Sequence, residues 1–343
     1  MSEWFLPTSE RPWTAGNLVV PRVHGAGYFA RLLELVEATT NGDRIFLTDW
    51  RGDADERLTA DGPTVADLLK SAAHRGVEVR ALLWRSHPGR LNSEENNELG
   101  QVINEAGGEA LLDERVRRAG SHHQKLVVVR FKGRPQDDVA FVGGIDLCHG
   151  RRDDADHHGD PQAPPLDERY GPTPPWHDAM AEIRGPAVAD VLETFAERWD
   201  DPTPLDHRNP YRAVHHRIVR MPRHPEPLPQ RWDSPPEAGP HQVQVLRTYP
   251  RKRPAYPFAP EGERSIARLY AGVPAGASTH LHRGPVLLVR RRRGNPRRGA
   301  ATRAGAAGHR RRAALPGGGQ PGLRPTDDVR AATRLGRAAR GGR

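Results

Sequence analysis

Two histidines, a glutamine and a lysine stand directly before an apolar run in SHHQKLVVVRF, residues 121–131. Two residues apart on a strand, His123 and Lys125 are expected on one face. His122 and Gln124 are then expected on the other. A neutral imidazole beside a fixed ammonium suits attack on a phosphate, because the histidine supplies a nucleophilic nitrogen and the lysine neutralises phosphoryl oxygens. The ammonium also disfavours a positive charge on the imidazole, which keeps the attacking nitrogen unprotonated.

Helical and extended patterns alternate around this stretch, and they must position it. We expect helices over 26–42, 63–76, 93–108 and 186–199, and strands over 44–50, 77–84, 125–131, 138–144, 179–185 and 242–249. Short strands that alternate with helices predict an α/β layered sandwich. Two polar, proline-rich segments, 150–175 and 202–240, are expected to be loops or linkers.

The net charge of +9 over 343 residues suggests a nucleic-acid partner until the charges are located along the chain. Residues 269–343 contain 17 arginines, no lysine and two aspartates, and the rest of the chain carries a net charge of −6. The body is therefore mildly acidic, and all of the basicity lies in the last 75 residues. The acidic body therefore argues against a nucleic-acid partner.

The arginine-rich segment 269–343 mixes Arg, Ala, Gly and Pro without apolar periodicity. Such a composition does not bury enough surface to offset the entropy of ordering, so we expect disorder there. One interpretation is an arm for anionic partners. The other is a frameshifted reading of GC-rich DNA, whose codons favour these residue types.

Cysteine content and hydropathy bear on where in the cell the protein is expected. Cys148 is the one cysteine, so no disulfide framework forms within the chain. The first residues, MSEWFLPTSERPW, lack the charged and apolar regions of a secretory signal. No apolar stretch of about 18 residues is present, so no transmembrane segment is expected. We therefore expect a cytoplasmic protein.

Three blocks of the sequence closely resemble, in order and spacing, the first catalytic half of the phospholipase D superfamily, in its plant and actinobacterial branch. The blocks are HHQKLVVV, VAFVGGIDLCHGRRDD and PWHDAMAEIRGPAVADVLETFAERW. The resemblance covers about Leu18 to Arg268. It implies an α/β/α sandwich with a mixed sheet, of which one half is complete. The implied organisation is a catalytic half over 1–240, the start of an incomplete second half over 241–268, and a disordered tail over 269–343.

The family motif is His-x-Lys, four residues and Asp, followed by a Gly-Ser-x-Asn element. His123 and Lys125 match its first two positions, and the resemblance implies that His123 is the nucleophile. Arg130 stands where the family has Asp, which puts the structural support of the motif in doubt more than its chemistry. The second element reads Gly143-Gly144-Ile145-Asp146, and its glycines either form a strand-end turn or let the backbone approach the phosphate.

A nucleophilic histidine needs an acceptor on its other ring nitrogen. Asp178 is our first candidate for that role and Asp146 the second, although Asp178 could equally open a strand and face water. We assign His177 to substrate phosphate binding. His157 and His158 lie in a polar loop, and the family chemistry uses no obligatory metal, so we expect neither a metal nor a cofactor.

Members of the family have two halves, one histidine attacking and the other protonating the leaving alcohol. The chain has no second His-x-Lys, because its lysines are Lys70, Lys125, Lys132 and Lys252. The nearest imitation is HLHRG, residues 280–284.

Three hypotheses follow. The first is a phospholipid phosphodiesterase that forms a phosphohistidine and completes its site as a homodimer. The second is an inactive or residual half-enzyme. The third is a nucleic-acid phosphodiesterase, against which the acidic body argues.

Overall fold

The structure is a computed structural model. It describes residues 5, 13–85, 94–117, 120–163, 169, 171–205, 214, 225–228, 232–272 and 286–291. The chain divides into two compact units, residues 1–293 and 294–343, and the second lies wholly outside the described residues.

One mixed sheet organises the first unit, in the order β11-β8-β1-β7-β6-β5-β2-β3-β4. Its strands are β1 (Thr14–Val23), β2 (Arg44–Asp49), β3 (Glu78–Trp84), β4 (Glu109–Asp113), β5 (Leu126–Arg130), β6 (Val139–Gly143), β7 (Ala179–Arg184), β8 (His241–Leu246) and β11 (Val286–Arg291). The neighbours β2, β3 and β4 run parallel, and the other pairs are antiparallel. A separate two-stranded sheet joins β9 (Thr248–Tyr249) to β10 (Glu263–Arg264).

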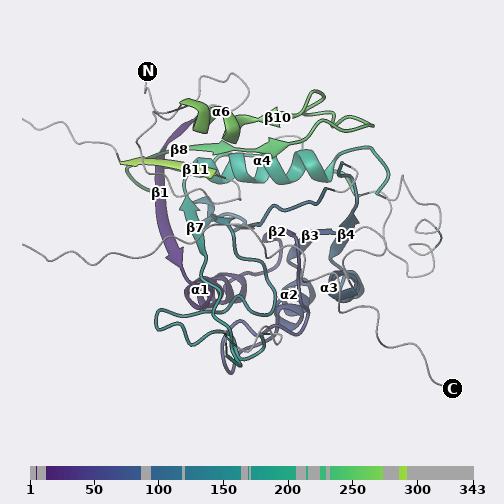
Figure 1. Cartoon of the computed structure of the whole chain (residues 1–343), viewed down its shortest axis with the longest axis vertical. Helices are drawn as coiled ribbons and strands as arrows, with labels where there is room; N and C mark the ends of the chain where they lie inside the picture. The colour runs from purple at the N-terminus through teal and green to yellow at the C-terminus, as the bar shows by residue number, and fades with distance from the viewer. Residues whose placement is uncertain are drawn as a thin grey trace, which may run out of the picture. The chain divides into compact units, whose positions relative to one another are not determined.

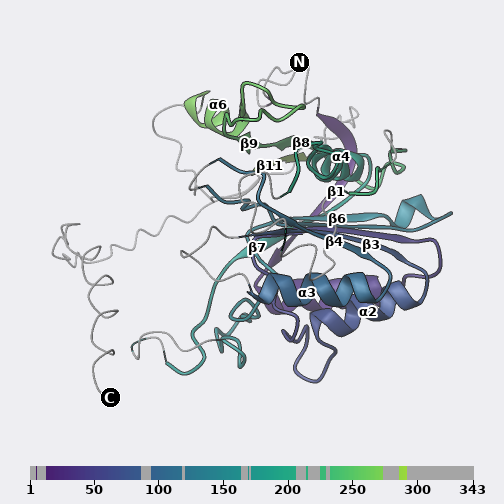
Figure 2. The same cartoon turned by 90° about the vertical axis from the view of Figure 1, so that its right-hand side faces the viewer.

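Helices cover both faces of the large sheet. Figure 2 shows α2 and α3 beneath the sheet and α4 above it, and Figure 1 shows α1 on the side of α2 and α3. The helices are α1 (Gly25–Glu37), α2 (Val65–His74), α3 (Glu94–Glu105), α4 (Ala187–Trp199) and the short α6 (Ser265–Gly272). This arrangement confirms the expected α/β fold with a mixed sheet between two helical layers.

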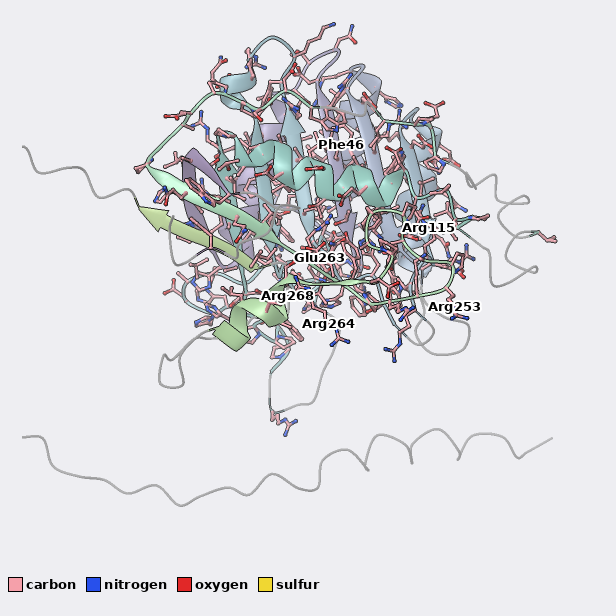
Figure 3. The ribbon with its side chains drawn as sticks, turned by 90° about the horizontal axis from the view of Figure 1, so that it is seen from above. Phe46, Arg115, Arg253, Glu263, Arg264 and Arg268 are labelled. Atoms are coloured by element: carbon pink, nitrogen blue, oxygen red, sulfur yellow. The ribbon has the colours of Figure 1, made fainter. Side chains whose placement is uncertain are left out.

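Alternation along the central strands divides the core between the two layers. Ile45 and Leu47 of β2 join the cluster under α1, α2 and α3. Phe46, between them, lies on the side of α4 (Figure 3) and joins the cluster under that helix. It packs against Phe195, with the ring centroids 5.3 Å apart. Because both faces are covered, the burial of the central strands is continuous rather than alternating.

The buried side chain of Asn17 joins α4 to β1. Its Oδ1 accepts a hydrogen bond from Ala187 N at 2.7 Å, which satisfies one of the four N–H groups that a helix leaves unpaired at its start. Its Nδ2 donates to Thr14 O at 3.0 Å. The start of α4 is thereby held against the sheet. The direction of the helix from that point determines the position of its last turn.

Four strands differ from the sequence expectation, and one of them is the two-residue β10, for which no strand was expected. Neither β1 nor β4 was expected, because β1 contains Gly16 and Pro21, which weaken a strand pattern, and β4 has only five residues. Strand β11 lies within the segment expected to be disordered, where residues 286–289 form a short apolar run that pairs with β8. Residues 273–285 and 292–343 of that segment, which include HLHRG, lie outside the described residues. Ser93, the first residue of the third expected helix, lies outside them as well.

Strand β8 continues the sheet of the preceding residues. It pairs with β1, through His241 opposite Asn17, so the segment assigned to a second half adds to the first half's sheet. The boundaries at 240 and 268 stay predictions. Among the described residues, the helices are too short or too polar to cross a membrane.

The packing of α2 generates a stability prediction. Leu69 is buried in the cluster under α1, α2 and α3, and Lys70, its neighbour, is exposed. Leu69→Ala should lower the free energy of unfolding by about 2–5 kcal/mol, because it removes buried methyl groups and leaves a cavity. Lys70→Ala should change it by less than about 0.5 kcal/mol. Urea denaturation of both variants measures the difference, and equal losses would contradict the helix orientation.

Candidate active site

Strand register brings the site residues together. Antiparallel pairing sets Thr48 of β2 opposite Leu126 of β5, so the residues that follow Thr48 lie beside those that precede Leu126. Leu126 in turn faces Val142 of β6, which brings Gly143 to the same end of the sheet. Because β3 and β4 run parallel to β2, their carboxyl ends point to this edge as well. The candidate site therefore lies where the ends of β2, β3 and β4 meet the start of β5.

The Lys125 ammonium is buried at this edge, with 3% of its side chain exposed. Its Nζ lies 3.2 Å from Asp146 Oδ1, and the Asp146 side chain is 1% exposed. The same Nζ lies 5.9 Å from the ring centroid of Trp50. A buried ion is stable only when its charge is paired, and Asp146 supplies the opposite charge.

Asp146 is itself held by the turn that follows β2. Its Oδ1 accepts hydrogen bonds from Trp50 N at 3.0 Å and Arg51 N at 3.3 Å. Beside it lies the buried carboxyl of Asp49, whose Oδ2 accepts from Leu147 N at 2.9 Å. Burial, together with the nearby charge of Asp146, raises the pKa of Asp49 well above its usual value. The environment therefore disfavours the ionised form of Asp49, and Asp146 is the carboxylate that lies in contact with Lys125.

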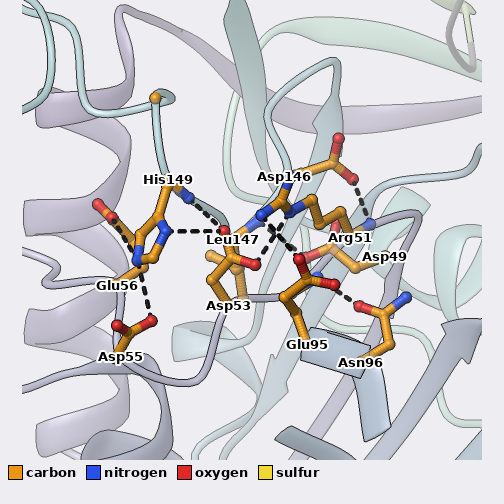
Figure 4. A network of polar contacts seen from close by, with 12 residues as sticks. Asp49, Arg51, Asp53, Asp55, Glu56, Glu95, Asn96, Asp146, Leu147 and His149 are labelled. Atoms are coloured by element: carbon orange, nitrogen blue, oxygen red, sulfur yellow. Dashed lines mark hydrogen bonds and ion pairs between the residues drawn. The ribbon is translucent and has the colours of Figure 1, made fainter. Parts of the chain in front are cut away.

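A polar network fixes the turn from Trp50 to Gly52 (Figure 4). The Nδ2 of Asn96 donates to Trp50 O at 3.0 Å and to Trp84 O at 2.6 Å, and its Oδ1 accepts from Gly52 N at 2.7 Å. The Trp50 and Trp84 rings stack with centroids 5.5 Å apart. Arg51 reaches Asp53 and Glu95, at 2.9 Å and 3.2 Å. The indole of Trp50 thus stacks on Trp84 of β3, and the Trp50 backbone is held by Asn96 of α3.

His123 is exposed and lies against the same indole. Its ring centroid is 5.5 Å from that of Trp50, at an interplanar angle of 59°. Strand β5 begins only at Leu126, so the expectation that His123 and Lys125 lie on a strand is wrong. The two side chains nevertheless contact one indole, which places an exposed imidazole and a buried ammonium at the same group.

His122 has a different environment from His123. It is buried, and its Nε2 lies 2.8 Å from Gln124 Oε1, while Gln124 Nε2 donates to Tyr249 Oη at 3.0 Å. Burial, and then the charge of Arg198, lowers the pKa of His122 to about 3. His122 is therefore neutral at physiological pH, and it pairs with Gln124.

A second buried charge network lies beside His122, and sequence reasoning missed it. Asp113, at the end of β4, accepts from Arg115 Nε at 2.9 Å and from Arg198 Nε of α4 at 2.7 Å. Tyr256 Oη donates to Arg115 O at 2.8 Å. The two guanidinium groups lower the pKa of Asp113 despite its burial. Asp113 and Arg198 are 85 residues apart, so spacing does not connect them, although Asp113 is the last residue of its strand, as Asp49 is.

The two glycines are explained by packing within the chain. A β-carbon on Gly143 would collide with Ala179 O, and one on Gly144 would collide with the Asp178 carboxylate. Gly143 N donates to Lys125 O at 3.4 Å, and Gly144 N donates to Ala179 O at 3.1 Å. Close approach is therefore required here by the chain itself, and a role in phosphate binding stays a prediction.

Asp178 and His177 make local contacts. Asp178 is half-buried at the start of β7, and its Oδ1 accepts from Ala179 N at 2.7 Å. The exposed His177 lies against His24, with their Nδ1 atoms 3.2 Å apart. Of the two candidate acceptors for the nucleophile, Asp146 is the one in contact with the His-x-Lys segment, through Lys125 rather than through His123.

Arg130, where the family motif has Asp, lies at the opposite end of β5 from Lys125. Its Nε is 2.8 Å from Asp138 Oδ2, and Asp138 Oδ1 also accepts from Phe131 N at 2.7 Å. A carboxylate is thus still present at this end of β5, supplied from the loop before β6 and paired with Arg130. The departure from the motif is accommodated away from the site.

Comparison with known proteins places this geometry in a family. The family model described as phospholipase D matches residues 45–248, more than half of the chain. Phospholipase D alpha 2 of Oryza sativa subsp. japonica is 31% identical over 228 residues, covering 51% of this chain and 28% of that protein. Phospholipase D alpha 1 of Ricinus communis is 31% identical over 215 residues, covering 48% and 26%. The chain spans less than a third of the length of these curated relatives.

Solved structures give weaker likenesses. Polyphosphate kinase from Porphyromonas gingivalis aligns with a TM-score of 0.36 and 17% identity, covering 60% of this chain and 30% of that one. A yeast tyrosyl-DNA phosphodiesterase mutant aligns with a TM-score of 0.26 and 12% identity, covering 48% and 31%. These scores are too low to support a comparison of sites. The family model and the His-x-Lys segment with its buried ion pair carry the assignment, and the chain belongs to the phospholipase D family.

Proposed function

We propose that this chain is a phospholipase D-type phosphodiesterase that acts on a phospholipid through a phosphohistidine at His123. The observation that carries the proposal is the pairing on one indole of an exposed imidazole, His123, with the buried ammonium of Lys125. The relatives named phospholipase D and the negative charge of residues 1–268 favour a phospholipid over a nucleic acid.

The proposed reaction has two displacements at phosphorus. A ring nitrogen of His123 forms a bond to phosphorus while the bond to the leaving alcohol oxygen breaks, and that oxygen takes up a proton from an acid. Water then attacks the phosphohistidine, the phosphorus–nitrogen bond breaks, and a base removes the proton of the water. Lys125 stabilises the charge on the phosphoryl oxygens in both steps. The backbone at Gly143 and Gly144 is our proposed further contact to the phosphate.

The surroundings of Asp49 support this role for Lys125. Two ionised carboxylates beside one ammonium would give the pocket a net negative charge and repel a phosphodiester. Burial and the charge of Asp146 raise the pKa of Asp49, which disfavours a second negative charge beside Lys125.

The leaving alcohol needs an acid that donates a proton to it. One copy of the chain has no second His-x-Lys to supply that acid. We propose that a homodimer brings a second His123 to the site. A residual half-enzyme that binds phosphate without turnover is the other candidate, and the missing second motif favours it.

The nucleophile can be identified by trapping. Wild-type protein incubated with labelled phosphatidylcholine should carry an acid-labile phosphate on His123, and His123→Asn should abolish both labelling and turnover. His122→Asn is the matched control, because His122 is adjacent, buried and bonded to Gln124. It should reduce stability by about 1–3 kcal/mol and retain labelling. Equal loss of label in the two variants, with both folded, would contradict the assignment.

A double-mutant cycle separates the structural and chemical roles of Lys125. Lys125→Met leaves the Asp146 charge buried and unpaired, and should lower the free energy of unfolding by about 3–5 kcal/mol. Lys125→Met/Asp146→Asn removes both charges but keeps the acceptor for Trp50 N and Arg51 N, so it should be more stable than the single variant. Turnover should be lost in both. Denaturation and a phosphodiester assay on all variants provide the check, and recovery of turnover in the double variant would exclude a charge role for Lys125.

The dimer predicts a dependence on protein concentration. General acid catalysis typically contributes about 10²–10⁴-fold, so monomers should turn over slower by a factor of that order. Specific activity measured over a dilution series should follow the dimer fraction measured by light scattering. Full activity from a monomeric preparation would rule out the shared site, whereas a dimer without phosphohistidine formation or turnover would support the residual half-enzyme.

A further inference from the structure

Three histidines and a buried aspartate gather outside the Lys125 site. Their members are His24, Asp153, His157 and His177, and one ligand atom from each lies within 4.8 Å of all the others. We call them the histidine cluster. Asp153 is 0% exposed, whereas His157 and His177 are exposed and His24 is intermediate. The four residues come from three separate parts of the chain, so only the fold brings them together.

Backbone hydrogen bonds join the three segments. His24 N donates to Asp178 O at 3.0 Å, and Ala26 N donates to Asp153 O at 2.9 Å. The loop that carries Asp153 is also anchored beside β2, since His149 N donates to Asp53 Oδ2 at 2.8 Å (Figure 4). The positions of the four side chains are therefore set by the same contacts that connect α1, this loop and β7.

Backbone conformation distinguishes two members of the cluster. Among the described residues other than glycine, positive φ angles occur at His24, 69°, and His157, 57°. Such conformations are unfavourable for residues with a side chain and persist where the surrounding structure requires them. Both of them here turn an imidazole toward the same group of side chains.

The spacing of the nitrogen atoms suits a small divalent cation. His24 Nδ1 and His177 Nδ1 are 3.2 Å apart, and two nitrogens bound at about 2.0–2.1 Å to tetrahedral Zn²⁺ are separated by about 3.3 Å. The His157 ring lies 5.4 Å from that of His24 and 5.3 Å from that of His177, between centroids. Asp153 Oδ2 lies 2.8 Å from His157 Nδ1, and its Oδ1 accepts from Gly159 N at 3.2 Å.

We propose that the histidine cluster binds one divalent transition-metal ion, of which Zn²⁺ fits best, through three imidazoles and the Asp153 carboxylate. Nitrogen-rich sites favour zinc and its neighbours over Ca²⁺ and Mg²⁺, which prefer oxygen ligands. Four protein ligands make a closed, structural site rather than one that activates water. The site does not depend on the proposed function.

The ion would hold the segment before β7 against the start of α1. His177 is the neighbour of Asp178, whose carboxylate lies against Gly144. Bound metal would therefore stabilise the approach of this segment to the end of β6. His158 lies outside the cluster: its Nδ1 is 2.8 Å from Asp154 Oδ2, and its side chain is exposed.

The test is metal binding by the untagged full-length chain. After removal of metal with a chelator and dialysis, Zn²⁺ is titrated in competition with a chromophoric chelator, and Co²⁺ is added separately to record its visible absorption. Wild type should bind one Zn²⁺ ion with an affinity higher than that of the histidines outside the cluster. The Co²⁺ spectrum should show the intense bands of tetrahedral coordination. His157→Ala and His177→Ala, both at exposed positions, should each weaken that binding at least about tenfold.

His158→Ala is the matched control, since it removes an adjacent exposed histidine outside the cluster. It should bind like wild type, and Zn²⁺ should raise the melting temperature of both but not of His157→Ala/His177→Ala. Far-UV circular dichroism shows that the variants are folded. The proposal is overturned if folded wild type binds no ion, or if the double variant binds with the stoichiometry and affinity of wild type.

Discussion

The ion pair of Lys125 and Asp146 is the interaction on which the surrounding structure depends. Two charges taken out of water are costly unless each is paired and hydrogen-bonded. Asp146 meets this requirement through Lys125 and through the N–H groups of Trp50 and Arg51. Those groups are available only because β2 ends where β5 begins. The charge pair therefore requires the register of β2, β5 and β6, and the register in turn places the imidazole of His123 beside the same indole.

Burial gives two adjacent histidines opposite properties. His122 is enclosed, hydrogen-bonded to Gln124 and kept neutral, with Arg198 nearby, whereas His123 is exposed on the Trp50 ring. Buried charge pairs lie on both sides of these two histidines. Asp146 pairs with Lys125 on one side, and Asp113 pairs with Arg115 and Arg198 on the other. One histidine of the pair is thus part of the packed framework, and the other is presented to solvent.

The local sequence pattern predicted many of the helices and strands. It did not predict the contacts between residues that are distant in sequence. Apolar periodicity located α1, α2 and α4 and the central strands, because burial on two faces leaves a strong signal. It missed β1, where Gly16 and Pro21 interrupt the pattern, and placed His123 on a strand that starts at Leu126. Trp50 was counted as the end of a strand, although its indole organises the site.

Contacts between distant residues left no local signal to read. His24 and His177 are more than 150 residues apart, and Asp113 and Arg198 are 85 apart. Spacing rules describe neighbours on one strand or helix, so they paired His157 with His158 and did not connect His157 to His24. Nor did they show that Asp138 supplies a carboxylate to Arg130 from the next turn. Such pairs become visible only when the order of the strands is known.

The position of β1 in the sheet has a consequence for synthesis on the ribosome. This strand lies between β7 and β8, and Leu18 pairs with Arg184. At about 5–20 residues per second, the amino-terminal segment waits roughly 10–30 s after its own synthesis before β7 emerges. During that interval its backbone groups and apolar side chains have no native partner, while β2, β3 and β4 are already able to pair with one another. Strand β1 is thus made well before the two strands that flank it, which leaves it exposed to misassociation in the nascent chain.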